Sequence, residues 1–142
     1  MHRLFLAWLL AATIFLAMDA VWLSVMTPLL YRPEIGGLMR ESFDIVAALL
    51  FYLLYTVGMS MLAIAPGLSA ARASAAAWRG ALLGLVAYGA YDLTSQATLH
   101  GWPWIVTLAD LAWGCVATSA ASALSCAATL AIGRRLAARR RH

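Results

Sequence analysis

Four long apolar segments alternate with short polar segments along the chain. They cover residues 4–26, 45–65, 77–99 and 104–132. Each is close to the roughly 20 apolar residues that a helix needs to cross the hydrocarbon core of a membrane. Pro66 follows the second segment, and Gly101 and Pro103 follow the third, at positions where glycine and proline are typical of loops. The pattern predicts an all-α polytopic membrane protein, folded as a compact four-transmembrane-helix bundle in one domain of residues 1–142.

The first segment has a second interpretation, as a cleavable signal peptide, because Arg3 precedes its apolar run. However, the run is long for the apolar region of a signal peptide. Asp19 and Trp22 also stand where a small-residue cleavage site is expected. We therefore expect this segment to be a membrane-spanning helix.

The composition agrees with a lipid environment. Hydrophobic residues make up 64% of the chain and charged residues 11%, against about 25% charged residues in an ordinary soluble domain. All ten cations are arginines, and five of them lie in a basic tail at residues 133–142. A basic tail directly after an apolar helix is typical of a topology anchor or of a contact with anionic lipid, here at Arg134–Arg141. We therefore do not expect nucleic-acid binding.

The arginines also predict the orientation. Eight of them fall on one side of the predicted bundle, at Arg3, in the loop between the second and third segments, and in the tail. The other side has two, Arg32 and Arg40, together with three acids. Because cytoplasmic loops carry the excess of arginine, both termini should be cytoplasmic in a bacterial inner membrane. Residues 27–42, which contain two prolines, should form a short amphipathic turn at the outer interface.

Three aspartates fall inside the predicted spans, at positions Asp19, Asp92 and Asp110. From the helical rise of 1.5 Å per residue, all three lie about 9–10 Å below the outer boundary. Asp44, at the outer start of the second span, is shallower. Carboxylates inside a membrane are costly and usually face the bundle interior. Three of them at one depth predict a functional site in the outer third of the membrane.

Helical spacing surrounds these acids with aromatic side chains. Residues three, four and seven apart share one face of a helix, so Tyr88, Tyr91 and Ser95 lie on the face of Asp92, and Trp22 lies on the face of Asp19. The expected ligand-binding residues are Trp22, Tyr88, Tyr91, Ser95, Trp113 and Asp44. In the same segments Gly80, Gly84 and the alanines after Gly114 predict close helix packing.

No arginine lies deep in a span to neutralise these acids. Three arrangements would do so: protonation of some aspartates, pairing with Arg32 or Arg40 from the outer segment, or a bound cation, amine or water network. His100 lies nearby, but its spacing from the acids is not diagnostic of a metal site, so no metal is expected. Cys115 and Cys126 lie about 16 Å apart on one helix, too far for a disulfide.

Four motifs around these residues resemble a family of bacterial membrane proteins known as domain of unknown function 2177. They are FLAMDAVWL at 15–23, FYLLYTVG at 51–58, YGAYDLTSQATLHGW at 88–102 and DLAWG at 110–114. The resemblance covers about residues 4–130. It implies a compact multi-pass protein whose motifs centre on Asp19, Asp92 and Asp110, and it implies no reaction or cofactor. Members often carry Asn where this chain has Ser95.

Three functions compete at this point. The favoured one is a site that binds or transforms a small or lipidic molecule from the outer leaflet, with Asp92 and Asp110 as acid and base and Asp19 orienting them. The second is a proton- or cation-coupled transporter, which would need a homo-oligomer because the inner halves of the spans hold almost no ionisable group. The third is a non-catalytic subunit of a membrane complex. In a purely structural alternative, the acids only form hydrogen bonds between helices, and each bond stabilises the bundle by about 0.6–2 kcal/mol.

Overall fold

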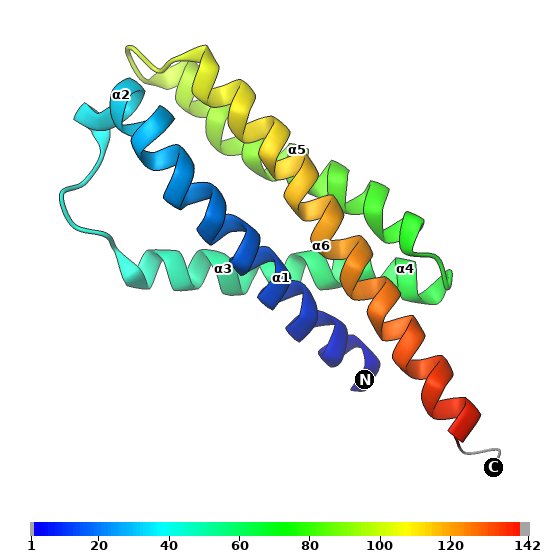
Figure 1. Cartoon of the computed structure of the whole chain (residues 1–142). Coiled ribbons are helices and arrows are strands. Elements are labelled where there is room, and N and C mark those ends of the chain that lie inside the picture. Colours follow the sequence, from blue (N-terminus) through cyan, green and yellow to red (C-terminus); the bar gives the residue numbers. More distant parts are fainter. Residues whose placement is uncertain (1, 140–142) are drawn as a thin grey trace.

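A computed structural model describes residues 2–139, and every regular element in that range is helical. Consecutive elements continue one another as long helical rods (Figure 1). The first rod is α1 (His2–Met26), η1 (Thr27–Tyr31), α2 (Arg32–Ile35) and η2 (Gly36–Leu38). The second is α3 (Ile45–Met59), η3 (Ser60–Ile64) and α4 (Ala65–Ser69). The third and fourth are α5 (Ala73–Thr98) and α6 (Trp104–Arg139). The predicted all-α fold with four long helices is confirmed.

Three of the rods are long and apolar enough to cross a membrane, judged by length and composition: His2–Leu38, Ile45–Ser69 and Trp104–Arg139. The remaining helix, α5, has 26 residues and is therefore about 39 Å long, enough to cross as well. It is less apolar because its buried positions hold small or polar residues, among them Gly80, Gly84, Gly89 and Asp92. Its length thus agrees with a fourth span, while its apolar character is weaker than in the other three.

In two places the helical structure continues beyond the predicted span, for the same physical reason. The first rod continues past Met26 to Leu38, and the second continues past Pro66 to Ser69. Proline lacks an N–H and clashes with the carbonyl four residues earlier. Pro33 and Pro66 each follow a π-helical turn, η1 or η3, that contains that earlier carbonyl. The wider turn accommodates the proline, so the rod continues.

The α5 and α6 helices form a closely packed antiparallel pair (Figure 1). A Cβ placed on Gly84 would collide with the backbone carbonyl of Gly114. One placed on Gly80 would lie 2.7 Å from the carbonyl oxygen of Thr118 and 2.7 Å from the hydroxyl of Ser122. The predicted glycine contact is therefore real, and it joins these two helices directly. Small residues permit this approach because no side chain separates the backbones.

A ring of hydrogen bonds closes the turn between α5 and α6. The amide of Gln96 donates to the carbonyl of Trp102 at 2.9 Å, and the indole of Trp102 donates to the hydroxyl of Thr107 at 3.1 Å. That hydroxyl donates in turn to the side-chain oxygen of Gln96 at 3.1 Å. Gly101 has a φ of +76°, a conformation that glycine adopts without steric cost. The ring and the glycine fix the register of the pair at the end where α5 meets α6 in the chain.

The second rod crosses the others obliquely (Figure 1). Its middle section, η3, packs against α1, α5 and α6, whereas α3 packs mainly against α1. The space between α3 and the α5–α6 pair is bridged by a long side chain: the hydroxyl of Tyr55 is hydrogen-bonded to that of Thr118 at 2.7 Å, and its ring meets that of Tyr88 edge-on. The N-terminal half of α3 therefore stands away from the pair and leaves room for a cavity.

The start of α1 and the end of α6 lie at the same end of the molecule (Figure 1). The predicted basic tail does not begin as a separate segment at residue 133, because α6 continues through Arg134 and Arg135 to Arg139 with those arginines exposed. Arg140 and Arg141 lie outside the described residues.

Candidate functional site

Asp19 connects three rods through its carboxylate. It lies on α1 and is 6% exposed. One of its oxygens accepts a hydrogen bond from the indole of Trp113 on α6 at 3.0 Å, and the other accepts one from the hydroxyl of Tyr52 on α3 at 2.5 Å. Both oxygens are thus held by neutral donors. This arrangement orients the carboxylate and compensates part of the cost of burying it.

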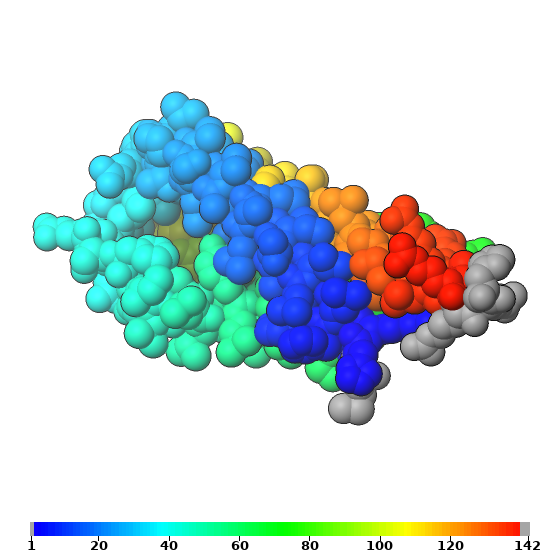
Figure 2. Space-filling view, turned by 60° about the horizontal axis from the view of Figure 1, so that its bottom comes forward, coloured from blue at the N-terminus to red at the C-terminus, as the bar shows by residue number. Residues whose placement is uncertain are grey.

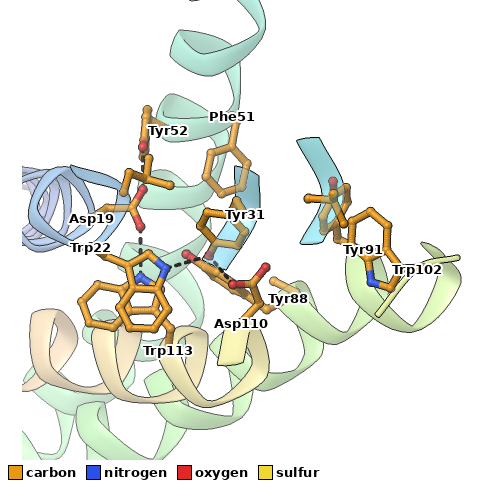
Figure 3. Close-up of a pocket in the computed structure, with 13 residues that line it drawn as sticks. Asp19, Trp22, Tyr31, Phe51, Tyr52, Tyr88, Tyr91, Trp102, Asp110 and Trp113 are labelled. Atoms are coloured by element: carbon orange, nitrogen blue, oxygen red, sulfur yellow. Dashed lines mark hydrogen bonds between the residues drawn. The ribbon is translucent and has the colours of Figure 1, made fainter. Parts of the chain in front are cut away.

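Asp110 lies across the bundle and has its own chain of donors. The hydroxyl of Tyr31, in η1, donates to one oxygen of Asp110, and the indole of Trp22 donates to the hydroxyl of Tyr31 at 2.8 Å. Trp22 in turn stacks on Trp113, with ring centroids 4.4 Å apart and an angle of 8° between the planes. The two acids are therefore linked through Tyr31 and a stacked indole pair (Figure 3).

A cavity of about 450 Å³ lies beside these side chains. Its walls are mostly aromatic, and the acids that reach it are Asp19 and Asp110. The complete lining consists of Asp19, Trp22, Leu23, Tyr31, Ile35, Phe51, Tyr52, Ala87, Tyr88, Tyr91, Trp102, Asp110 and Trp113. Figure 2 shows a hollow between α1 and α3, next to the segment that joins them, with chain from the start of α6 visible at its base. The cavity thus opens sideways, between two rods that are apolar enough to face lipid.

Asp92 lies behind the cavity wall, between α5 and α6. Its side chain is fully buried, and none of the described residues donates a hydrogen bond to either carboxyl oxygen. The carboxyl group of Asp110 is a near neighbour of the Asp92 carboxyl group. Two carboxylates are both acceptors, so this contact becomes a hydrogen bond only when one of them carries a proton. Two neighbouring acids are able to share one proton.

The other predicted ligand residues divide into two groups. Tyr88 and Tyr91 line the cavity, as do Trp22 and Trp113. Ser95 is half-buried on α5 and does not line it. Asp44 caps the start of α3, where it accepts a hydrogen bond from the backbone N–H of Ala47 at 3.1 Å, and it does not line the cavity either.

No arginine enters the cavity. Within residues 2–139 the ion pair present is Arg40–Asp44, 3.1 Å long and exposed to solvent. Arg32 does not line the cavity, and His100 is exposed. The described part of the chain also holds no group of three or more His, Cys, Asp or Glu side chains placed to bind a metal ion. The acids therefore lie close together with only neutral donors around them.

The sequence-based prediction missed Tyr31, Tyr52 and Trp102 as parts of the cavity. Tyr52 was placed within a motif but not at the site, although it lies on the second span at a depth similar to that of Asp19. Tyr31 lies in the segment that was expected to be an irregular interfacial turn. The continuous helix from α1 through η1 brings this tyrosine back over the bundle.

Comparison with known proteins gives one match. The family DUF2177, described as a predicted membrane protein, matches residues 4–127 of the chain. No curated protein and no solved structure matches.

Proposed function

Since the chain belongs to the DUF2177 family of predicted membrane proteins, we propose that it is a membrane protein whose cavity binds an amphiphilic molecule taken up sideways from the bilayer. The observation that carries this proposal is the composition of the cavity. Aromatic and aliphatic walls surround two carboxylates, Asp19 and Asp110, whose cavity partners are neutral hydroxyl and indole groups. Such a lining matches a ligand with an apolar body and a small polar group.

The side opening suits a ligand that is already dissolved in lipid. The hollow lies between α1 and α3, and the surfaces of those helices away from the bundle are rich in exposed large apolar side chains, such as Val21, Leu50 and Leu54. Those surfaces contact acyl chains in a membrane, so a lipidic molecule reaches the cavity without passing through water. A water-soluble ligand would have to cross the same apolar rim.

The chemistry of the cavity selects the polar group of the ligand. Carboxylates accept hydrogen bonds and attract positive charge, and the faces of Trp22, Trp113 and Tyr88 also attract cations. A phosphate or carboxylate group would be repelled by Asp19 and Asp110. The favoured ligand is therefore an amphiphile whose polar group donates hydrogen bonds, as an amine or a hydroxyl does.

The neighbouring carboxyl groups of Asp92 and Asp110 add a reaction to the proposed binding. Asp110 lines the cavity and Asp92 lies directly behind it. A proton shared by the pair passes from Asp110 to a basic atom of the ligand, and the pair takes a proton back from another atom of the ligand. Asp19 contributes by orienting Trp113, and Tyr31 by orienting Asp110. This is general acid–base chemistry of the kind that an isomerisation requires.

The orientation in the membrane is part of the proposal. Arg3, Arg72, Arg79 and the arginines at the end of α6 lie at one end of the rods, and the cavity lies toward the other. The positive-inside rule therefore favours a cytoplasmic location for both termini in a bacterial inner membrane, with the cavity in the outer third.

Filling the cavity provides the test. The full-length protein is extracted from membranes in a mild detergent and analysed by native mass spectrometry for copurifying molecules. Ala87→Phe places a ring in the cavity, because Ala87 lines it. The matched control is Ala90→Phe, three residues away on the same helix, at an exposed position that does not line the cavity.

We expect a bound amphiphile on the wild type and on the Ala90→Phe variant, and its loss from the Ala87→Phe variant. Asp110→Asn should weaken its retention because the amide is neutral. A wild-type protein that carries no molecule, or a molecule that Ala87→Phe retains equally well, contradicts the proposal.

A further inference from the structure

A second hollow, lined partly by arginine, lies at the opposite end of the bundle from the aspartates. It is made of two adjoining cavities of about 400 and 410 Å³ between the start of α1 and the last turns of α6. Both are lined by Arg3, Thr129 and Gly133. The first also contains Ser69 and Arg134. We call this hollow the basic notch.

The side chain of Arg3 lies in the notch against Gly133 of α6. A Cβ built on Gly133 would lie 3.5 Å from both Cζ and Nη2 of Arg3. The guanidinium group therefore lies against the backbone of α6, across from the helix that carries it. Neither Arg3 nor Arg134 forms an ion pair with any of the residues between 2 and 139. The six acids of the chain all lie toward the opposite end of the rods: Asp19, Glu34, Glu41, Asp44, Asp92 and Asp110.

Thr129 supplies an independent observation. It is 2% exposed, and its hydroxyl has no hydrogen-bond partner among the described residues. A buried hydroxyl without a partner costs about 1–3 kcal/mol. Because Thr129 lines both cavities of the notch, a ligand oxygen placed there would accept a hydrogen bond from its hydroxyl. Thus a buried donor and two unpaired guanidinium groups surround one hollow.

We propose that the basic notch binds the phosphate group of an anionic lipid. Guanidinium groups bind phosphate oxygens through paired hydrogen bonds, and Thr129 adds a neutral donor. The remaining walls include Leu6, Leu68, Leu130 and Ile132, which suit an acyl chain better than a free ion. The notch also lies at the end of membrane-spanning rods, where lipid headgroups are located. This site does not depend on the cavity near Asp110.

The test compares lipids that differ in headgroup only. The full-length protein in a neutral detergent is incubated with phosphatidylglycerol or phosphatidylcholine of identical acyl chains, and bound lipid is counted by native mass spectrometry. A parallel sample receives inorganic phosphate. The variants are Arg3→Gln and Thr129→Val, and the matched control is Arg79→Gln. Arg79 lies at the same end on α5, is exposed, and does not line the notch.

We expect the wild type and the Arg79→Gln variant to prefer phosphatidylglycerol. Arg3→Gln should lower that affinity about tenfold, the usual size of a lost charge-assisted hydrogen bond, and Thr129→Val should lower it by a smaller factor while leaving the net charge unchanged. Equal binding of the two lipids overturns the proposal. It is also overturned if Arg79→Gln and Arg3→Gln weaken binding equally, or if inorganic phosphate competes fully with the lipid.

Discussion

We expect substitution by alanine to have opposite effects at two glycines on α5. Gly84 faces α6, and an added Cβ would collide with the carbonyl group of Gly114. Gly89 lies five residues further along, where the nearest atom to an added Cβ is Cδ1 of Leu93 on the same helix, at 3.8 Å. The first contact is with backbone, which cannot rotate away, and the second is an ordinary van der Waals distance.

The magnitudes follow from these distances. Gly84→Ala must push α5 and α6 apart and should cost about 1–3 kcal/mol in the free energy of unfolding, as overpacking does. Gly89→Ala adds no clash and should be neutral or stabilising by up to about 1 kcal/mol, because alanine favours the helix over glycine. In Gly84→Ala, the separation of α5 from α6 also disturbs the site, because Asp92 lies eight residues after Gly84 and Asp110 lies four residues before Gly114.

The assay is reversible unfolding in mixed detergent micelles, in which increasing dodecyl sulfate is followed by tryptophan fluorescence and circular dichroism. The wild type, Gly84→Ala and Gly89→Ala are measured side by side. An unfolding free energy of Gly84→Ala equal to or above that of the wild type would refute the close α5–α6 contact. So would an equal loss in both variants.

Three further predictions use the same titration. Tyr31→Phe removes the hydroxyl that links Trp22 to Asp110 and should cost about 1–3 kcal/mol; an unchanged stability would contradict that bridge. Asp92→Asn should stay within about 1 kcal/mol of the wild type, because an amide N–H donates to Asp110 as a shared proton would, whereas a large loss would show that Asp92 is needed as a charge. Arg40→Ala should change stability by less than about 1 kcal/mol, because its ion pair with Asp44 is exposed, and a larger loss would mean that this pair supports the fold.

The helical architecture and the three buried aspartates could be predicted from the sequence because both depend on local rules. Apolar length predicts a span, and an acid within a span is expected to face the protein. Asp19, Asp92 and Asp110 are indeed all buried. The sequence also indicated Trp22 and Trp113 as neighbours of these acids. What it does not encode locally is that the two indoles stack on each other across the bundle.

The differences arise where one residue has two possible environments. Asp44 was grouped with the deeper acids by its place at the outer end of a span, but an aspartate just before a helix readily caps it, and here it does. Ser95 shares a face of α5 with Tyr88 and Tyr91, but the part of α5 that lines the cavity ends at Tyr91. To predict that Tyr31 lies at the site, one must know the path of the chain beyond Met26. That path depends on a π turn next to Pro33, which no simple sequence pattern signals.

A high-resolution experimental map of the protein in lipid nanodiscs tests the central claim most directly. The account predicts elongated density that enters between α1 and α3 and ends in contact with the carboxyl groups of Asp19 and Asp110. A cavity closed by its own side chains, or carboxyl groups that point into the surrounding lipid, would contradict it.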